Sequence, residues 1–351
     1  METSVFAGIV VTLTAGLIMG SSPVPLKFLR SFQYEHFGFI SMLVSLLLIP
    51  WIITLIFCPD ISGVFREMDW VIVLKANFFS LAWGVAQVLA LLCFIRIGVS
   101  LTYGILCAVG ASVGVITPMI IKATGIFSES PDLFSLNGLI VLGGVMVMVL
   151  GVYLASLSGF QREKLMQEEK SAITDKKPGS FRTGLIMVII AGILSAGWGF
   201  AFAYSQGPIV EIMTRHGAAD LPSKIAVWAF ALFGAAIVNI LYPAYLLTRN
   251  KSWGVITGNG REILLCVLYG LLFFIPSVLL GKGMLLLGAL GASVGVGITQ
   301  SAIIVGGQIL GFASGEWKGI HGKPRQYIYA AILVLVVAMI ILGLGNLISQ
   351  P

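Results

Sequence analysis

Long apolar runs alternate with short polar segments along the whole chain. The runs are solidly apolar rather than apolar at every second residue, and each is long enough to cross a roughly 30 Å hydrocarbon core as a helix. This pattern predicts an all-α membrane protein with ten transmembrane helices. The predicted spans are 4–22, 37–57, 76–96, 98–121, 136–157, 183–205, 225–248, 263–284, 286–312 and 326–348.

One long polar segment interrupts this pattern near the middle. Residues 159–182, GFQREKLMQEEKSAITDKKPGSFR, hold ten charged residues and no predicted span. They predict a first five-helix repeat (1–158), a cytoplasmic linker (159–182) and a second five-helix repeat (183–351). Because five is odd, the second half would enter the membrane in the opposite orientation. This is the 5+5 inverted repeat of many secondary transporters.

Weak internal similarity supports the repeat. GIVVTLTAGL (8–17) aligns with GLIMVIIAGI (184–193), and the hexapeptide GASVGV occurs at 110–115 and again at 291–296. The two hexapeptides fall in equivalent predicted spans but at different registers. We interpret them as small-residue packing patterns that let two helices approach closely.

The distribution of charged residues predicts the orientation of the chain in the membrane. Lys and Arg concentrate in the loops after odd-numbered spans, which hold fifteen of the 21, whereas the opposite loops hold six. This bias predicts that both termini are periplasmic and that the linker is cytoplasmic, in a bacterial inner membrane. The net charge of +6 therefore orients the chain in the lipid bilayer and does not indicate nucleic-acid binding. The first apolar run follows Glu2 without a basic segment, so we expect a retained span rather than a signal peptide.

Enzymatic chemistry is not indicated. The three His residues fall in separate predicted loops, the acids are scattered, and the four Cys have no metal-ligand spacing. A phosphate-binding Gly-rich loop followed by Lys and Ser or Thr is also missing from the sequence, so we expect neither ATP-driven transport by this chain nor a cofactor. Glu129 and Glu316 are interpreted as structural groups that cap the following span or pair with basic loop residues.

Several segments in order resemble one family along nearly the whole chain. They are PLKFLRSFQYEHFG (25–38), AWGVAQ (82–87), IRIGVSLTYGI (95–105), ILSAGWGFAFA (193–203), LPS (221–223), FGAAIVNI (233–240) and GEWKGIHGKPR (315–325). The chain resembles the bacterial L-rhamnose–proton symporter family, within the drug/metabolite transporter superfamily. The resemblance implies import of a deoxy sugar with a coupling proton, by alternating access in a chain that is sufficient as a monomer. Export of a metabolite or drug, common in the superfamily, is the alternative.

Polar and aromatic side chains inside the spans are the candidates for sugar binding. Amides can replace water around the sugar hydroxyls, and an aromatic ring can cover the C–H face. Trp83 and Gln87 are four residues apart and would share one helical face. The other candidates are Asn77, Trp198, Asn239, Gln300 and Ser301. The alternative is that these residues fill the core or bridge neighbouring helices.

Charges near the spans are few. Glu35 is the candidate proton carrier, and a salt bridge with Lys27 or Arg30 is the alternative interpretation. Lys282 lies among apolar residues and is a candidate intramembrane cation, unless its ammonium group extends to the interface. Pro276, in the middle of a predicted span, is the candidate hinge for alternating access or a fixed kink.

Overall fold

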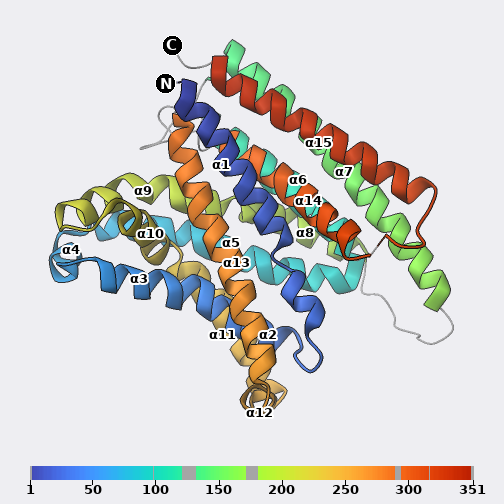
Figure 1. Ribbon diagram of the computed structural model, residues 1–351, viewed down its shortest axis with the longest axis horizontal. Helices are drawn as coiled ribbons and strands as arrows, with labels where there is room; N and C mark the ends of the chain where they lie inside the picture. Colours follow the sequence, from blue (N-terminus) through green and yellow to red (C-terminus); the bar gives the residue numbers. More distant parts are fainter. Residues whose placement is uncertain are drawn as a thin grey trace.

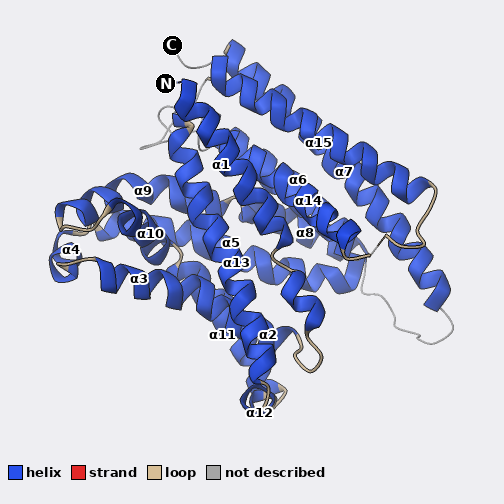
Figure 2. Ribbon diagram, in the orientation of Figure 1, coloured by secondary structure: helices blue, strands red, loops and turns tan. Residues whose placement is uncertain are grey.

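The computed structural model describes residues 2–97, 99–120, 132–170, 181–288, 294–315 and 317–348. Within these ranges the secondary structure is helical and includes no strand, as Figure 2 shows. Glu129, Glu316 and the first three residues of the second GASVGV lie outside the described residues, so the predictions for them stay untested.

The helices follow the predicted apolar runs closely. They are α1 (Glu2–Ser21), α2 (Tyr34–Met42), α3 (Ile49–Phe57), α4 (Ile61–Glu67), α5 (Trp70–Ile97), α6 (Val99–Ile120), α7 (Leu136–Lys170), α8 (Phe181–Ser195), α9 (Gly197–Arg215), α10 (Asp220–Ala231), α11 (Phe233–Arg249), α12 (Trp253–Thr257), α13 (Gly260–Leu286), α14 (Val296–Ala313) and α15 (Lys323–Ile348) (Figure 1). A 3₁₀ turn, Val24–Phe28, follows α1, and a π-helical segment, Leu43–Leu48, joins α2 to α3.

Among the described residues, eight segments are long and apolar enough to cross a membrane, and the bent pair α10–α11 is a ninth. The apolar part of α6, Gly104–Ile120, is shorter than a full span. The structure therefore supports eight or nine of the ten predicted spans by length and composition.

Five predicted spans have the wrong boundaries. The span predicted at 76–96 begins at Trp70, and the span predicted at 286–312 overlaps the end of α13 at Leu286 and forms α14 from Val296. The span predicted at 225–248 is two helices, α10 and α11, that meet at 56°. The span predicted at 183–205 is interrupted by a turn at Ala196 and continues as α9 to Arg215. The span predicted at 136–157 continues as α7 to Lys170, because helical hydrogen bonding does not stop where the sequence becomes polar.

The bend between α10 and α11 is held by α5. The Asn77 amide nitrogen donates to the Phe230 carbonyl at 2.7 Å, and the Asn77 amide oxygen accepts from the Gly234 N–H at 2.6 Å. The Ser80 hydroxyl accepts from the Ala235 N–H at 3.3 Å. A Cβ at Gly234 would lie 2.2 Å from the Asn77 carbonyl oxygen, so only glycine permits this approach. Side chains of α5 thus satisfy backbone groups that the bend would leave unpaired.

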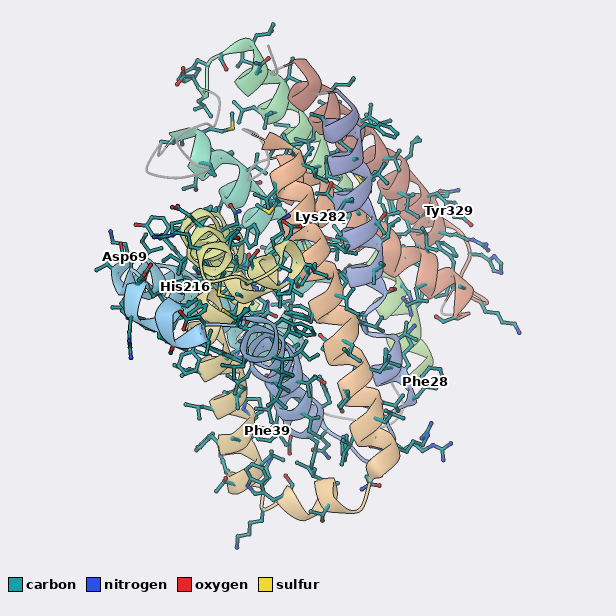
Figure 3. All side chains as sticks on the ribbon, turned by 60° about the vertical axis from the view of Figure 1, so that its left-hand side comes forward. Phe28, Phe39, Asp69, His216, Lys282 and Tyr329 are labelled. Atoms are coloured by element: carbon teal, nitrogen blue, oxygen red, sulfur yellow. The ribbon has the colours of Figure 1, made fainter. Side chains whose placement is uncertain are left out.

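Contacts between loops define two ends of the bundle, which are well separated in Figure 1. At the α12 end (22–33, 250–262 and 313–323), Lys27 Nζ donates to Ser314 Oγ at 2.9 Å, and the Glu262 carboxylate meets the loop after α1. At the α4 end (58–69 and 215–220), His216 Nδ1 lies 2.8 Å from Asp60 Oδ2. Away from these two ends, α7 and α15 run side by side along one edge of the molecule in Figures 1 and 3.

Candidate functional site

Four aromatic rings from four helices contact one another in series inside the bundle. We call this group the tryptophan cluster: Trp83 of α5, Trp198 of α9, Trp228 of α10 and Phe273 of α13. Ring centroids are 6.4 Å apart for Trp83 and Trp198, and 6.1 Å apart for Trp83 and Phe273. Trp198 stacks on Trp228 at 5.3 Å. Two of these rings, Trp83 and Trp198, were predicted for the site, and the structure brings them together.

The positions of these rings follow from how α5 packs. Two residues that follow Trp83 lie on different faces of α5 and contact different helices. Gly84 lies against Ala235 of α11, and Ala86 packs near α8. Trp83 lies between these two contact faces and is 7% exposed. Gln87, one turn further along α5, continues the same inward face and is half-buried.

Several polar groups beside the tryptophan cluster have unused hydrogen-bonding capacity. The indole N–H of Trp198 is buried without a hydrogen-bond partner. The Gln87 amide makes no hydrogen bond within the described part of the chain. Buried donors and acceptors without partners are unfavourable, so such groups commonly await a ligand or water.

Two further predicted amides are Gln300 and Asn239, and helical spacing places Gln300 toward this region. Val296, one turn before Gln300 on α14, lies against Gly199 of α9, next to Trp198. Gln300 is half-buried, and its side-chain amide forms no hydrogen bond to the described residues. Asn239 is 3% exposed, and its amide nitrogen donates to the carbonyl of its own helix four residues earlier, at 3.0 Å.

The remaining predicted sugar-site residues are Asn77 and Ser301. Asn77 uses both its amide nitrogen and its amide oxygen to hold the bend between α10 and α11, which favours the helix-bridging alternative. Ser301 is fully buried, one turn after Gly297, which packs against Leu342 of α15 and Val115 of α6. Val296 contacts α6 and α9, whereas Gly297 contacts α6 and α15, so Ser301 lies on the face of α14 next to that of Gln300. The Ser301 hydroxyl is buried without a hydrogen-bond partner, and its role in sugar binding stays a prediction.

The candidate proton carrier lies at the α12 end. Glu35, in the first turn of α2, is 6% exposed, and its carboxylate accepts a hydrogen bond from the Asn250 amide at 3.0 Å. The neighbouring His36 ring accepts from the Gln33 N–H through Nδ1, so its Nε2 donates to the Ser252 carbonyl at 3.2 Å. These contacts tie the start of α2 to the loop after α11.

Lys282 lies on the outer surface of α13 (Figure 3). Leu268 and Ile275 precede it at intervals of seven residues and are 43% and 50% exposed, so the three share one exposed helical face. This placement favours an ammonium group that extends to the interface. Pro276 is buried within α13, which runs unbroken from Gly260 to Leu286, and its hinge role stays a prediction.

Three further residues, Trp228, Phe273 and Ser45, were not predicted from the sequence. Trp228 and Phe273 lie in runs of apolar and aromatic residues that look like ordinary core, although a Trp beside a helix break is a usable signal. Ser45 lies in the π-helical segment, fully buried and with its hydroxyl unpartnered. Single π-helical turns are frequent at functional sites, but nothing in the local sequence marks this one.

Comparison with known proteins identifies the family. The sequence model described as L-rhamnose-proton symport protein (RhaT) matches residues 1–348. An L-rhamnose-proton symporter of Yersinia pestis (strain Pestoides F) is 24% identical over 98% of this chain and 99% of its own length. One from Cronobacter sakazakii is 23% identical over the same shares. With its apolar helices, this match makes the protein an integral membrane transporter rather than an enzyme, and the chain belongs to the L-rhamnose-proton symport protein family.

Proposed function

We propose that this protein imports L-rhamnose or a related deoxy sugar together with a proton, and that the tryptophan cluster is the sugar site. The observation that carries the proposal is the meeting of Trp83 and Trp198 beside the unengaged Gln87 amide. The names of its relatives, L-rhamnose-proton symporters, support L-rhamnose as the substrate and a proton as the coupling ion.

The chemistry of the cluster fits a deoxy sugar. The indole faces cover the C–H face of the ring, and the apolar surroundings accept the methyl group. The amides of Gln87 and Gln300 and the indole N–H of Trp198 replace water around the hydroxyls. A sugar lacking one of these hydroxyls would leave a buried group unpaired, which is the basis of selectivity.

We propose that transport proceeds by alternating access in a 5+5 inverted repeat of the drug/metabolite transporter type. The first half (1–158) contributes α5 to the cluster, and the second half (183–351) contributes α9, α10 and α13, so the proposed site lies between the halves. Rocking of the halves would open the α4 end and the α12 end in turn. By the positive-inside rule the α12 end faces the cytoplasm of the bacterial inner membrane and both termini are periplasmic. Both halves are in one chain, so a monomer suffices.

The sugar site is tested by uptake of labelled L-rhamnose into proteoliposomes, with and without an inward proton gradient. Trp198→Phe keeps a ring but removes the indole donor, so we expect the apparent affinity to fall about tenfold. Trp70→Phe is the matched control, because Trp70 is 46% exposed and lies outside the cluster. Lack of rhamnose uptake by folded wild-type protein would refute the substrate and favour export instead.

Glu35 is the proposed proton carrier. An ionised carboxylate accepts the Asn250 hydrogen bond, and protonation weakens this link between α2 and α11. We expect Glu35→Gln to retain rhamnose exchange but to lose accumulation driven by the proton gradient. Lys282→Gln is the control and should retain both activities, since Lys282 is on the outer surface. Gradient-driven accumulation by Glu35→Gln would contradict this assignment.

A further inference from the structure

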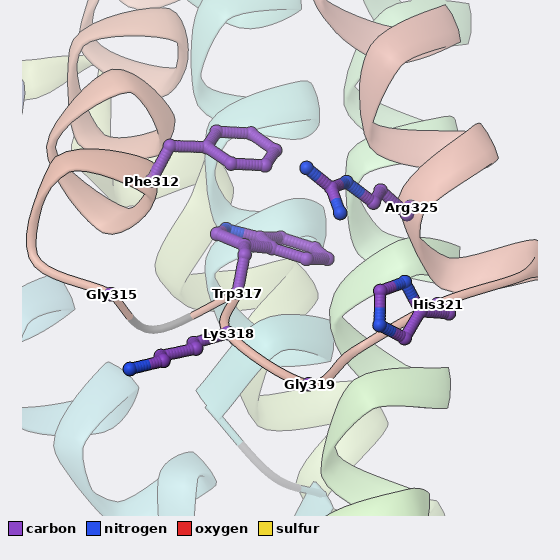
Figure 4. Close-up of a pocket in the computed structure, with 7 residues that line it drawn as sticks. All are labelled: Phe312, Gly315, Trp317, Lys318, Gly319, His321 and Arg325. Carbon is purple, nitrogen blue, oxygen red and sulfur yellow. The ribbon is translucent and has the colours of Figure 1, made fainter.

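A pocket of about 510 Å³ opens beside the loop between α14 and α15, at the α12 end. Its lining includes Phe312, Trp317, Lys318, His321 and Arg325, together with two glycines (Figure 4). The residues that line the pocket include none of the tryptophan cluster, and sugar transport as proposed above does not use the pocket.

Aromatic stacking fixes the shape of this pocket. Phe312 stacks on Trp317 with centroids 5.1 Å apart and on Tyr329 at 5.5 Å. The Arg325 guanidinium lies 5.9 Å from the Phe312 ring centroid, and its Nε donates to the Tyr329 hydroxyl at 2.8 Å. These contacts hold the guanidinium in one orientation, which leaves its terminal N–H groups available for a planar, bidentate acceptor.

The polar groups of the pocket are donors and cations. Trp317 is 4% exposed, and its indole N–H has no hydrogen-bond partner. Lys318 and His321 are exposed, and Arg325 lies on the same side of Trp317 as His321, whereas Lys318 lies on the other side (Figure 4). Among the lining residues that the structure describes there is no carboxylate. Such a set of groups suits an anion that carries several acceptor oxygens.

The location of the pocket indicates which kind of anion it binds. The pocket lies where α14 ends and α15 begins, so it is at the boundary of two membrane spans, where Trp, Tyr and basic side chains meet lipid headgroups. An exposed apolar face leads away from it along α15, formed by Tyr329, Leu333 and Ile340, which are 50%, 66% and 56% exposed. Tyr329 belongs both to the aromatic stack and to this face, so the two are continuous.

We infer that this pocket binds the phosphate headgroup of an anionic phospholipid, whose acyl chain lies along the exposed face of α15. The guanidinium of Arg325 and the ammonium of Lys318 bind the phosphate oxygens, and the Trp317 indole supplies a buried hydrogen bond. Basic pockets between helices are known to recognise lipid headgroups in this manner. A free phosphate ion would use the same donors but would not use the apolar face.

The test is native mass spectrometry of the full-length protein in detergent, with added phosphatidylglycerol or phosphatidylcholine. We expect selective retention of phosphatidylglycerol, weakened about fivefold by Lys318→Gln and by Arg325→Gln. Trp317→Phe preserves the stack and removes only the N–H donor, so it should also weaken retention. Arg249→Gln, which removes an exposed charge at the same end, is the matched control. Thermal unfolding confirms that each variant is folded.

Three results would overturn the inference. Equal retention by wild-type protein, Lys318→Gln and Arg325→Gln would remove the pocket from lipid binding. An equal loss in Arg249→Gln would reduce the effect to diffuse surface charge. Displacement of bound phosphatidylglycerol by inorganic phosphate at equal concentration would assign the donors to a free anion.

Discussion

The two ends of the bundle are joined by different chemistry. At the α12 end, the Glu262 carboxylate is 4% exposed and accepts the backbone N–H groups of Arg30, Ser31 and Phe32 at 2.7 to 3.1 Å. At the α4 end, side chains pair with side chains: His216 contacts Asp60, and Glu67 lies 3.3 Å from the other ring nitrogen. Asp60 and Glu67 are 53% and 51% exposed. One end is held by buried bonds to the main chain, and the other by exposed ionisable groups.

The exposed contact at the α4 end depends on pH. Hydrogen bonding to Asp60 raises the pKa of His216 above its usual 6.5. The Gly63 N–H, and after it His216, lowers the pKa of Asp60 below its usual 3.8. The His216 contribution to stability is therefore fully present below pH 6.5 and is lost as pH rises through the raised pKa. The Asp60 contribution is present above pH 3.8 and is lost as pH falls through the lowered pKa.

Among the substitutions that test the two ends, Glu262→Ala should lower the melting temperature most. The substitution leaves three backbone donors without their acceptor in a buried turn, so we expect the melting temperature to fall by about 5 °C or more. Glu262→Gln retains one acceptor oxygen and should fall between Glu262→Ala and wild type. Melting is measured in detergent by the loss of monodisperse protein on heating. Wild-type stability of Glu262→Ala would mean that the α12 end does not depend on this carboxylate.

A smaller, pH-dependent effect is expected from His216→Gln. Between about pH 4 and pH 6.5 the variant should melt below wild type, by about 2 °C or less, because exposed ion pairs contribute little. Above pH 6.5 the two melting curves should converge as His216 loses its proton in wild type. Melting temperatures at half-unit pH steps give the comparison. A difference that is constant across this range would show that titration of His216 does not control the contact.

The smallest effect is expected from Asp220→Asn at the same end. Asp220 is 78% exposed and pairs with Lys224 one helical turn along α10. Such exposed pairs on one helix contribute at most a few tenths of a kcal/mol, so the melting temperature should change by less than about 1 °C. This variant sets the baseline for His216→Gln. A larger loss than that of His216→Gln would reverse the proposed order of contacts at the α4 end.

The sequence predicts where helices lie better than how they bend. Apolar runs locate helices at all ten predicted positions, because membrane spans need an unbroken hydrophobic surface. The bend between α10 and α11 escapes the same reasoning, because its residues are apolar on both sides. It depends on Asn77, which lies 157 positions before Gly234. A local pattern carries no information about that partner.

In the candidate site, too, positions along one helix are predicted better than contacts between helices. Spacing along one helix places Gln87 one turn from Trp83, and the two flanking glycines, Gly197 and Gly199, draw attention to Trp198. Spacing does not reveal which neighbouring helices the adjacent residues Gln300 and Ser301 face, because that depends on how α14 packs against α6, α9 and α15. It also does not show that Lys282 shares an exposed face with Ile275, which becomes clear once burial is known.

The contact between Asn77 and the helix bend restricts which amino acids are acceptable at position 77. The bend presents one carbonyl acceptor and one N–H donor to the same side chain. A short carboxamide answers both from a single planar group, whereas an aspartate offers only acceptors and a leucine offers neither. Glutamine has the correct group on a longer stem, which would have to fold back to reach both partners. The shape of the main chain in one helix therefore dictates the chemical identity of a residue in another.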